Sequence, residues 1–240
     1  TRTVTGSPVT TTVTASPVTS TVTVTAAPVT PPPQLKEPVM LTIASGPTGG
    51  YWYVIAALYA EELKKALPAG SSVTVKTGGT YANFGTTEDK VTDIALASSH
   101  AYKAALEGVE PAEKKYGNIR ALASLGLVQL AHIVASGDAA KFDTLGELLK
   151  AKFPAKFATL TKAGFNYWQA KNLLEAFGVT FDDFKKWGGN VVYISLAETV
   201  SLMKDGHINM YLATEPYHSV PSYNQEVMAS VKTMKSLYIE

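Results

Sequence analysis

From Pro38 onward, the pattern of hydrophobic positions switches repeatedly between the period of a strand and the period of a helix. Short apolar or alternating runs predict strands at 39–44, 72–77, 93–97, 119–125, 130–135, 157–160, 191–194, 208–212 and 236–239. Apolar residues spaced near 3.6 positions predict helices at 52–67, 81–90, 98–108, 142–151, 167–177, 196–204 and 216–231. This alternation favours an α/β fold in which parallel sheets are covered by helices on both faces.

The first 33 residues have a different pattern, built almost wholly from Thr, Val, Ala, Ser and Pro. Regularly spaced prolines favour extended or polyproline conformations and oppose central strand pairing, which is typical of a solvated stalk open to O-glycosylation. A strict alternation at Thr21, Val22, Thr23, Val24 and Thr25 instead predicts a strand that could add to the sheet edge of a neighbouring subunit. Both interpretations assign residues 1–37 to an arm.

Composition narrows the possible classes of protein. The 240 residues carry a formal net charge of +1, so no electrostatic footprint for nucleic acid is present. The absence of cysteine excludes disulfides and thiol catalysis within this sequence. No apolar run reaches about 18 residues, so the sequence predicts no membrane span. The Thr-rich arm and the threonine at position 1 favour an extracytoplasmic protein, periplasmic or at the cell surface, whose signal segment has been removed.

Three turns rich in small residues each follow a predicted strand and open a predicted helix: 46–50 (GPTGG), 77–80 (TGGT) and 98–100 (SSH). A helix start leaves N–H groups unpaired and carries a partial positive charge. Glycine lets the backbone approach a ligand closely, and Ser or Thr adds a hydroxyl, so the turns suit a carboxylate or phosphate. The alternative is that these residues merely cap helices. The spacing does not match a nucleotide-binding signature.

Several segments together resemble one family of binding proteins, the TRAP-transporter-associated extracytoplasmic solute receptors (TAXI family). The resemblance covers about residues 39–240 and is carried by 43–53 (IASGPTGGYWY), 77–83 (TGGTYAN), 93–96 (DIAL), 119–125 (IRALASL), 132–134 (HIV), 202–208 (LMKDGHI) and Pro216. The family's chains continue beyond the position of Glu240, which implies either a piece of a longer chain or a shortened member.

The resemblance implies a two-lobed, type II-like periplasmic-binding-protein fold behind the arm. One lobe would span 38–128 and the other 129–218, and 219–240 would return toward the first lobe. It also implies a glutamate-like amino acid or other small carboxylate as ligand, delivery to a membrane permease, and no catalysis. Ligand contacts would come from the first two turns: Thr48, Gly49, Gly50, Tyr53, Thr80 and Asn83. From its position near the first turn, Tyr51 could wall the pocket.

Two departures from the family pattern affect the expected ligand. Ser99 and His100 stand where the family reads Ser-Asp, so an imidazole replaces a carboxylate and changes the charge that a pocket tolerates. In the second lobe, 162–165 (KAGF) replaces a Gly-Ser-Gly-Thr turn. Lys162 could pair with a second carboxylate and favour a diacid, although an exposed lysine is the more common situation.

No residue pattern indicates a cofactor, a metal site or catalysis. The histidines lack metal-ligand spacing, and the paired acidic residues fit solvated helix faces. Two functions therefore remain. The first is a receptor for a small anionic metabolite. The second is a surface-assembly or filament subunit that reuses the binding-protein fold and forms homo-oligomers through its arm.

Overall fold

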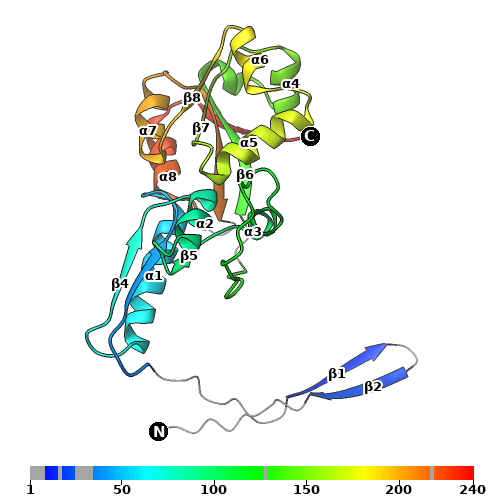
Figure 1. Ribbon diagram of the computed structural model, residues 1–240. Helices are drawn as coiled ribbons and strands as arrows, with labels where there is room; N and C mark the ends of the chain where they lie inside the picture. Colours follow the sequence, from blue (N-terminus) through cyan, green and yellow to red (C-terminus); the bar gives the residue numbers. More distant parts are fainter. Residues whose placement is uncertain (1–8, 16–17, 25–34, 127–128, 217–218) are drawn as a thin grey trace. The chain divides into compact units, whose positions relative to one another are not determined.

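The computed structural model describes residues 9–15, 18–24, 35–126, 129–216 and 219–240 (Figure 1). The chain divides into two compact units, Thr1–Glu37 and Pro38–Glu240. In the first unit, β1 (Val9–Ala15) and β2 (Val18–Val24) form a two-stranded antiparallel sheet. The strand predicted at 21–25 falls in β2 except for Thr25, which lies outside the described residues. This strand pairs with β1 of the same chain. The described part of the arm is thus a hairpin, whereas the prolines suggested an extended stalk.

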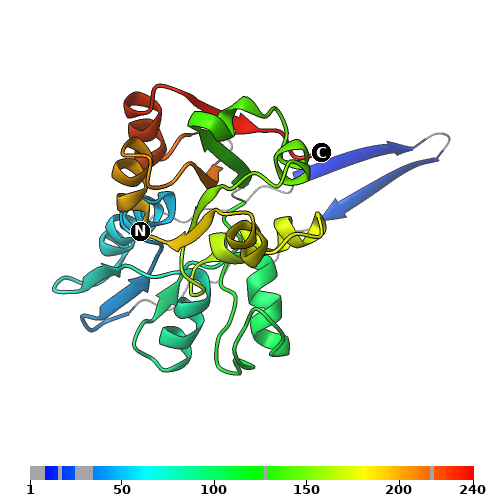
Figure 2. The same ribbon diagram turned by 90° about the horizontal axis from the view of Figure 1, so that it is seen from above.

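The first lobe of the second unit is built on a three-stranded parallel sheet of order β4-β3-β5. Its elements are β3 (Met40–Ala44), α1 (Tyr51–Ala66), β4 (Ser72–Lys76), α2 (Thr80–Glu88), β5 (Ile94–Ala95) and α3 (Ser99–Glu107). The small residues Ala56 and Ala60, one helical turn apart, let α1 pack closely on Ile43 and Val73 of the sheet (Figures 1 and 2).

The second lobe is built on a five-stranded sheet of order β10-β6-β9-β7-β8, in which β6 runs antiparallel to its neighbours. Its strands are β6 (Gln129–Ser136), β7 (Lys156–Thr159), β8 (Asn190–Tyr193), β9 (Met210–Pro216) and β10 (Met234–Leu237). Its helices are η1 (Gly137–Lys141), α4 (Leu145–Lys150), α5 (Phe165–Ala176), α6 (Phe181–Lys186), α7 (Leu196–Lys204) and α8 (Ser222–Ser230).

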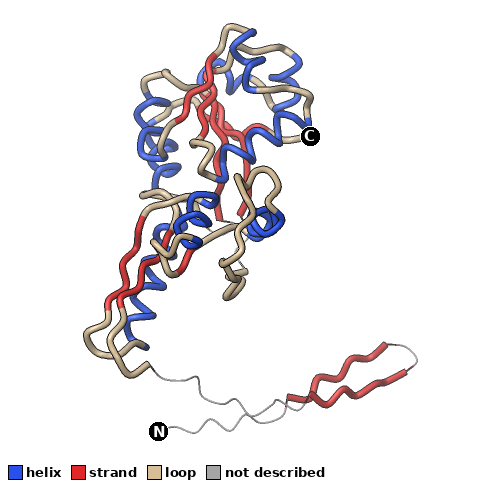
Figure 3. The backbone as a smooth tube through the Cα atoms, viewed as in Figure 1, coloured by secondary structure: helices blue, strands red, loops and turns tan. Residues whose placement is uncertain are grey.

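Helices cover both faces of this second sheet, as the sequence pattern predicts (Figure 3). Helices α4, α5 and α6 bury one face around Phe157, whose ring stacks on Phe184 at a centroid distance of 5.7 Å. On the other face, α7 and α8 pack through Met203 and Val227. Each face therefore carries its own apolar cluster, which holds the helices against the sheet.

Capping boxes determine where three helices of the second lobe begin. In each box, the carboxylate of the acidic residue three positions later accepts the N–H of the cap residue, which is Thr144, Thr180 or Ser195. The hydroxyl of Thr144 accepts the N–H of Glu147 in return, whereas the hydroxyls of Thr180 and Ser195 donate to the same carboxylate. The box at Thr180 starts α6, a helix that the hydrophobic pattern did not predict. None of the described helices combines the length and the apolar character needed to cross a membrane.

Two predicted elements are wrong. No strand forms at 119–125, and the side chain of Leu122 is 77% exposed there, because this segment has no neighbouring strand with which to pair. The helix predicted at 216–231 begins only at Ser222, since Pro216 ends β9 and Pro221 occupies the N-cap of α8.

The last segment also differs from the prediction that it returns to the first lobe. Strand β10 pairs antiparallel with β6, from Met234↔Ser136 to Leu237↔Ile133, and so extends the second sheet. Leu237 is buried in the core of that lobe. The open edge of β6 and the burial of this leucine therefore keep the end of the described chain in the second lobe.

Candidate functional site

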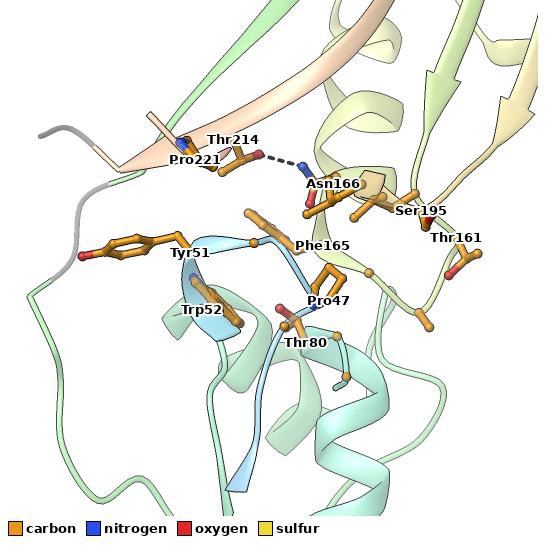
Figure 4. Close-up of a pocket in the computed structure, with 18 of the residues that line it drawn as sticks. Pro47, Tyr51, Trp52, Thr80, Thr161, Phe165, Asn166, Ser195, Thr214 and Pro221 are labelled. Carbon is orange, nitrogen blue, oxygen red and sulfur yellow. Dashed lines mark hydrogen bonds between the residues drawn. The ribbon is translucent and has the colours of Figure 1, made fainter. Parts of the chain in front are cut away.

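A pocket of about 320 Å³ lies between the two lobes (Figure 4). Its walls come from the loops that follow β3, β4, β7 and β8, at the carboxyl ends of these strands. This is where open α/β sheets bind ligands, because the loops there connect strand ends to helix starts.

The starts of five helices, α1, α2, α5, α7 and α8, meet at this pocket. The lining residues at these starts are Gly50, Tyr51, Trp52, Gly79, Thr80, Ala82, Gly164, Phe165, Asn166, Ser195, Leu196, Pro221 and Tyr223. Each helix start carries unpaired N–H groups and the positive end of a dipole. Their convergence gives the pocket a positive potential to which no described side chain of the lining adds a charge.

Many of these backbone donors remain available. In the described part of the chain, no acceptor is present for the N–H groups of Tyr51, Trp52, Thr80, Phe165, Asn166 and Leu196. The N–H groups of Gly50, Gly164 and Ser195, by contrast, already donate to acceptors in their own loops or helices. The free donors thus come from both lobes, which suits an anion held between them.

Thr80 adds a side-chain donor to this set. The residue is only 2% exposed, and its Oγ1 makes no hydrogen bond to any described group. Figure 4 shows Thr80 beside Pro47 and Trp52 on the first-lobe side of the pocket. A buried hydroxyl without a partner costs free energy, so this group is expected to have a partner when the pocket is filled.

The remaining walls are apolar or neutral. Apolar surface is supplied by Pro47, Trp52, Leu160, Phe165, Ile194, Leu196 and Pro221. None of the described lining residues is Asp, Glu, Lys, Arg or His. The lining Tyr223 also stays neutral, because burial raises the pKa of its hydroxyl above the ordinary value. The pocket therefore combines a limited positive potential with space for a small apolar group.

Three hydrogen bonds orient neutral polar side chains at the pocket. Asn166 donates from Nδ2 to Thr214 Oγ1 at 3.0 Å, and Thr214 donates to Gln169 Oε1 at 2.8 Å (Figure 4). Trp52 Nε1 donates to Gln129 Oε1 at 3.2 Å, which links α1 of the first lobe to β6 of the second. Because an indole nitrogen can only donate, the amide nitrogen of Gln129 must point away from Trp52.

Three of the predicted ligand-binding residues line this pocket: Gly50, Tyr51 and Thr80. The structure places the others outside its lining: Thr48, Gly49, Tyr53, Asn83, Ser99, His100 and Lys162. Thr48 and Gly49 are exposed at the apex of the first turn. The N–H of Tyr53 donates to Gly50 O within α1, so this amide is already used.

The third turn and Lys162 also lie apart from the pocket. Ser99 is exposed, and the His100 ring packs on Phe165 at a centroid distance of 4.5 Å, where partial burial lowers its pKa. The exposed Lys162 extends its Nζ over the Tyr167 ring, 5.9 Å from the centroid. Lys162 is therefore not part of the lining in this structure, and its pairing with a second carboxylate stays a prediction.

Asn83 has a structural role next to the pocket. Its amide nitrogen donates to Ser45 O at 2.9 Å and to Leu96 O at 2.8 Å, and its Oδ1 accepts the N–H of Gly79 at 3.1 Å. These bonds tie together the loops after β3, β4 and β5. The motif that suggested a ligand contact thus marks the residue that holds the first-lobe loops in position.

None of the second-lobe lining was predicted to bind the ligand. The missed residues are Gln129, Leu160, Thr161, Ala163, Gly164, Phe165, Asn166, Ile194, Ser195, Leu196, Thr214, Pro221 and Tyr223. A signal existed for two of the loops, since residues 161–165 and Ser195 each stand between a predicted strand and a predicted helix, as in the first lobe. Gln129 and Thr214 lie within strands, where no local pattern could have indicated a pocket.

Solved structures support the fold at low sequence identity. PhnD1 from Prochlorococcus marinus, solved in complex with methylphosphonate, matches with a TM-score of 0.55 and 14% identity over 83% of this chain and 71% of that one. The periplasmic nitrate-binding protein NrtA from Synechocystis PCC 6803 matches with a TM-score of 0.52 and 16% identity, over 86% of this chain and 52% of that one. A binding protein component of an ABC phosphonate transporter from Pseudomonas aeruginosa gives 0.50 and 13%, over 84% and 64%. The chain thus has the α/β fold of periplasmic solute-binding proteins.

The sequence comparisons identify the family. Among curated proteins, none matches this chain. The model of the NMT1-like family matches residues 43–237, which include nearly all of both lobes and every residue of the described pocket lining. The chain therefore belongs to the NMT1-like family.

Proposed function

We propose that this chain is a solute-binding receptor that closes two lobes around a small ligand with one anionic group, without catalysis. The observation that carries the proposal is the meeting of five helix starts, with free N–H groups and the unpaired Thr80 hydroxyl, at one pocket. These donors would surround the oxygens of a carboxylate, phosphonate or sulfonate and replace the water that the anion loses.

The lack of charged side chains in the described lining supports a ligand with a single anionic group. A helix start contributes about half of an elementary charge, so several of them can balance one anion. A second carboxylate would need a cation of its own, and Lys162 lies outside the pocket. The apolar walls around Phe165 and Leu196 favour a short apolar substituent on the ligand rather than a second polar group.

The proposed partner is a membrane permease, with the chain on the extracytoplasmic side of the membrane. The neighbour from Pseudomonas aeruginosa is a component of an ABC phosphonate transporter, which supports delivery of this kind. The finer alternative, a TRAP permease and a glutamate-like ligand, is supported only by the TAXI-like sequence motifs, such as those at 43–53 and 77–83.

A thermal-shift panel tests the proposal with methylphosphonate, methanesulfonate, propionate, nitrate, glutamate and succinate. A probe at 100 times its Kd should stabilise the fold by about 2.7 kcal/mol, which is a rise in Tm of about 5–10 °C for a chain of this size. We expect at least one probe with a single anionic group to give this shift. Binding of succinate alone, or of no probe by the folded protein, would contradict the proposal.

The pH dependence and a lysine variant serve as controls. Affinity for methanesulfonate should stay constant between about pH 7 and 8, because the described lining contains no carboxylate, amine or imidazole. Burial raises the pKa of Tyr223 and lowers that of His100, so both groups are neutral across this range.

Lys162→Ala should bind the probe with unchanged affinity. A tenfold loss in this variant would restore Lys162 as a ligand contact.

A second candidate function, a surface-assembly or filament subunit, is favoured by one observation on the arm. Among the described strands, β1 and β2 pair only with each other, so each keeps a free edge. Isolated two-stranded sheets are marginally stable in water and gain from a third strand. The third strand would come from another copy of this chain.

Deleting residues 1–37 tests the assembly role. If the arm joins subunits, light scattering should show oligomers for the full chain and monomers for the truncated chain, with ligand binding unchanged. A monomeric full chain, or oligomers that survive the deletion, would exclude arm-mediated assembly.

A further inference from the structure

The two lobes touch closely at Gly79, the N-cap of α2. A Cβ placed on Gly79 would lie 3.0 Å from the carbonyl oxygen of Ala163 and 3.4 Å from the Cα of Gly164, both in the loop before α5 of the second lobe. Both neighbouring atoms belong to the backbone and cannot rotate away, unlike the end of a flexible side chain. Any residue other than glycine would therefore press the second lobe away.

Backbone conformation does not explain the glycine at this position. Gly79 has φ −163° and ψ 155°, an extended conformation that any residue can adopt. Within its own lobe, the N–H of Gly79 donates to Asn83 Oδ1, and its carbonyl accepts the N–H of Asn83. Any residue could make these two backbone bonds. The need for glycine thus arises at the contact between lobes.

The same carbonyl of the second lobe also completes α2. The N–H of Tyr81 donates to Ala163 O at 3.3 Å, so the second lobe satisfies one of the free donors at the start of this helix. This bond exists only while the lobes are in contact. A substituent on Gly79 would both lengthen this bond and move Ala163 and Gly164, which line the pocket.

We propose that Gly79 is a closure residue, which has no side chain so that the two lobes can reach the arrangement that completes the pocket. This inference rests on the proposed function, because closure matters for a ligand held between lobes. Gly50 is a less clear case. A Cβ there would meet Leu196 Cδ1 at 3.1 Å, but it would also meet Pro47 O of its own loop at 3.0 Å.

The distance between lobes provides a direct test. The chain has no cysteine, so Lys103→Cys on α3 and Asp182→Cys on α6 give one spin label on each lobe. Both side chains are more than 70% exposed, at 77% and 74%. Pulsed electron paramagnetic resonance then measures the distance distribution with and without methylphosphonate. We expect Gly79→Val to remove the short-distance population of the unsubstituted protein and to weaken probe binding about tenfold or more.

Controls separate closure from folding and from ligand choice. Gly79→Ala is the milder variant if Gly79→Val folds poorly, and urea unfolding should show little change for either one. Gly85→Ala is the matched control on the same helix, because a Cβ there meets nothing within 4 Å, and its distances and affinity should stay unchanged.

The outcomes distinguish this inference from the proposed function. If the distance distributions of Gly79→Val and the unsubstituted protein are identical, the closure role is overturned, whether or not a probe binds. If the unsubstituted protein binds none of the probes yet Gly79→Val still removes the short distances, the closure role stands and the proposed function fails.

Discussion

Asn83→Leu is expected to lower the free energy of unfolding by about 3–5 kcal/mol, because three backbone groups lose their hydrogen-bond partner at once. Asn83 is 1% exposed, so water cannot replace the lost bonds. Leucine has a similar size but no polar atoms, and it would leave Ser45 O, Leu96 O and the Gly79 N–H unpaired at the core of the first lobe. Urea unfolding followed by circular dichroism measures the change.

The same substitution should abolish ligand binding, since the loops after β3 and β4 lose their common anchor. Asn172→Leu is the matched control, because Asn172 is an exposed residue of α5 and its side chain makes no hydrogen bond to a described group. It should change stability by less than about 0.5 kcal/mol. A loss below about 1 kcal/mol for Asn83→Leu would show that the three bonds do not hold these loops together.

Thr80→Val is expected to weaken binding of an anionic probe by about 10–100-fold, while the stability of the unliganded protein stays the same or rises. The two side chains have nearly the same shape, so the change removes only the hydroxyl that is buried without a partner. A hydrogen bond to a charged group contributes about 1.5–3 kcal/mol, which corresponds to the expected loss of affinity. Titration calorimetry and urea unfolding measure the two effects separately.

The control for this prediction is Thr80→Ser, which keeps the hydroxyl and removes one methyl group. Thr80→Ser should retain most of the affinity for the probe and lose some stability. Thr80→Val should instead lose affinity and keep or gain stability. If Thr80→Val binds normally, the hydroxyl is not a ligand donor. If it unfolds more easily than the parent protein, then Oγ1 has a structural partner instead.

Local patterns determined the elements because their causes are local. The spacing of apolar residues predicted α1 and α7 nearly to the residue, and short apolar runs predicted β3, β7 and β8. The prediction failed at 119–125, where a similar apolar run finds no adjacent strand. Strand formation requires a partner elsewhere in the chain, so an apolar run alone does not decide it.

In the candidate site, too, local sequence patterns predicted some features, while contacts with distant segments decided others. A strand, a small-residue turn and a helix start are adjacent in sequence, so the turns at 46–50 and 77–80 could be recognised as possible anion sites. Which atoms face the pocket depends on the approach of the other lobe. Thr48 and Gly49 are exposed, while Pro47 and Trp52 line the pocket, and Asn83 is turned inward to hold three loops.

By itself, the sequence determined that the chain alternates strands and helices, that a Thr-rich arm precedes them, and that helix starts rich in small residues follow the strands. The tertiary structure decided which helix starts meet and that none of the described side chains lining their pocket is charged. It also decided that Gly79 fits against Ala163 of the other lobe. The physical reason is distance along the chain. Periodicity and capping act within a few residues, whereas the pocket is formed by contacts between segments about 80 residues apart.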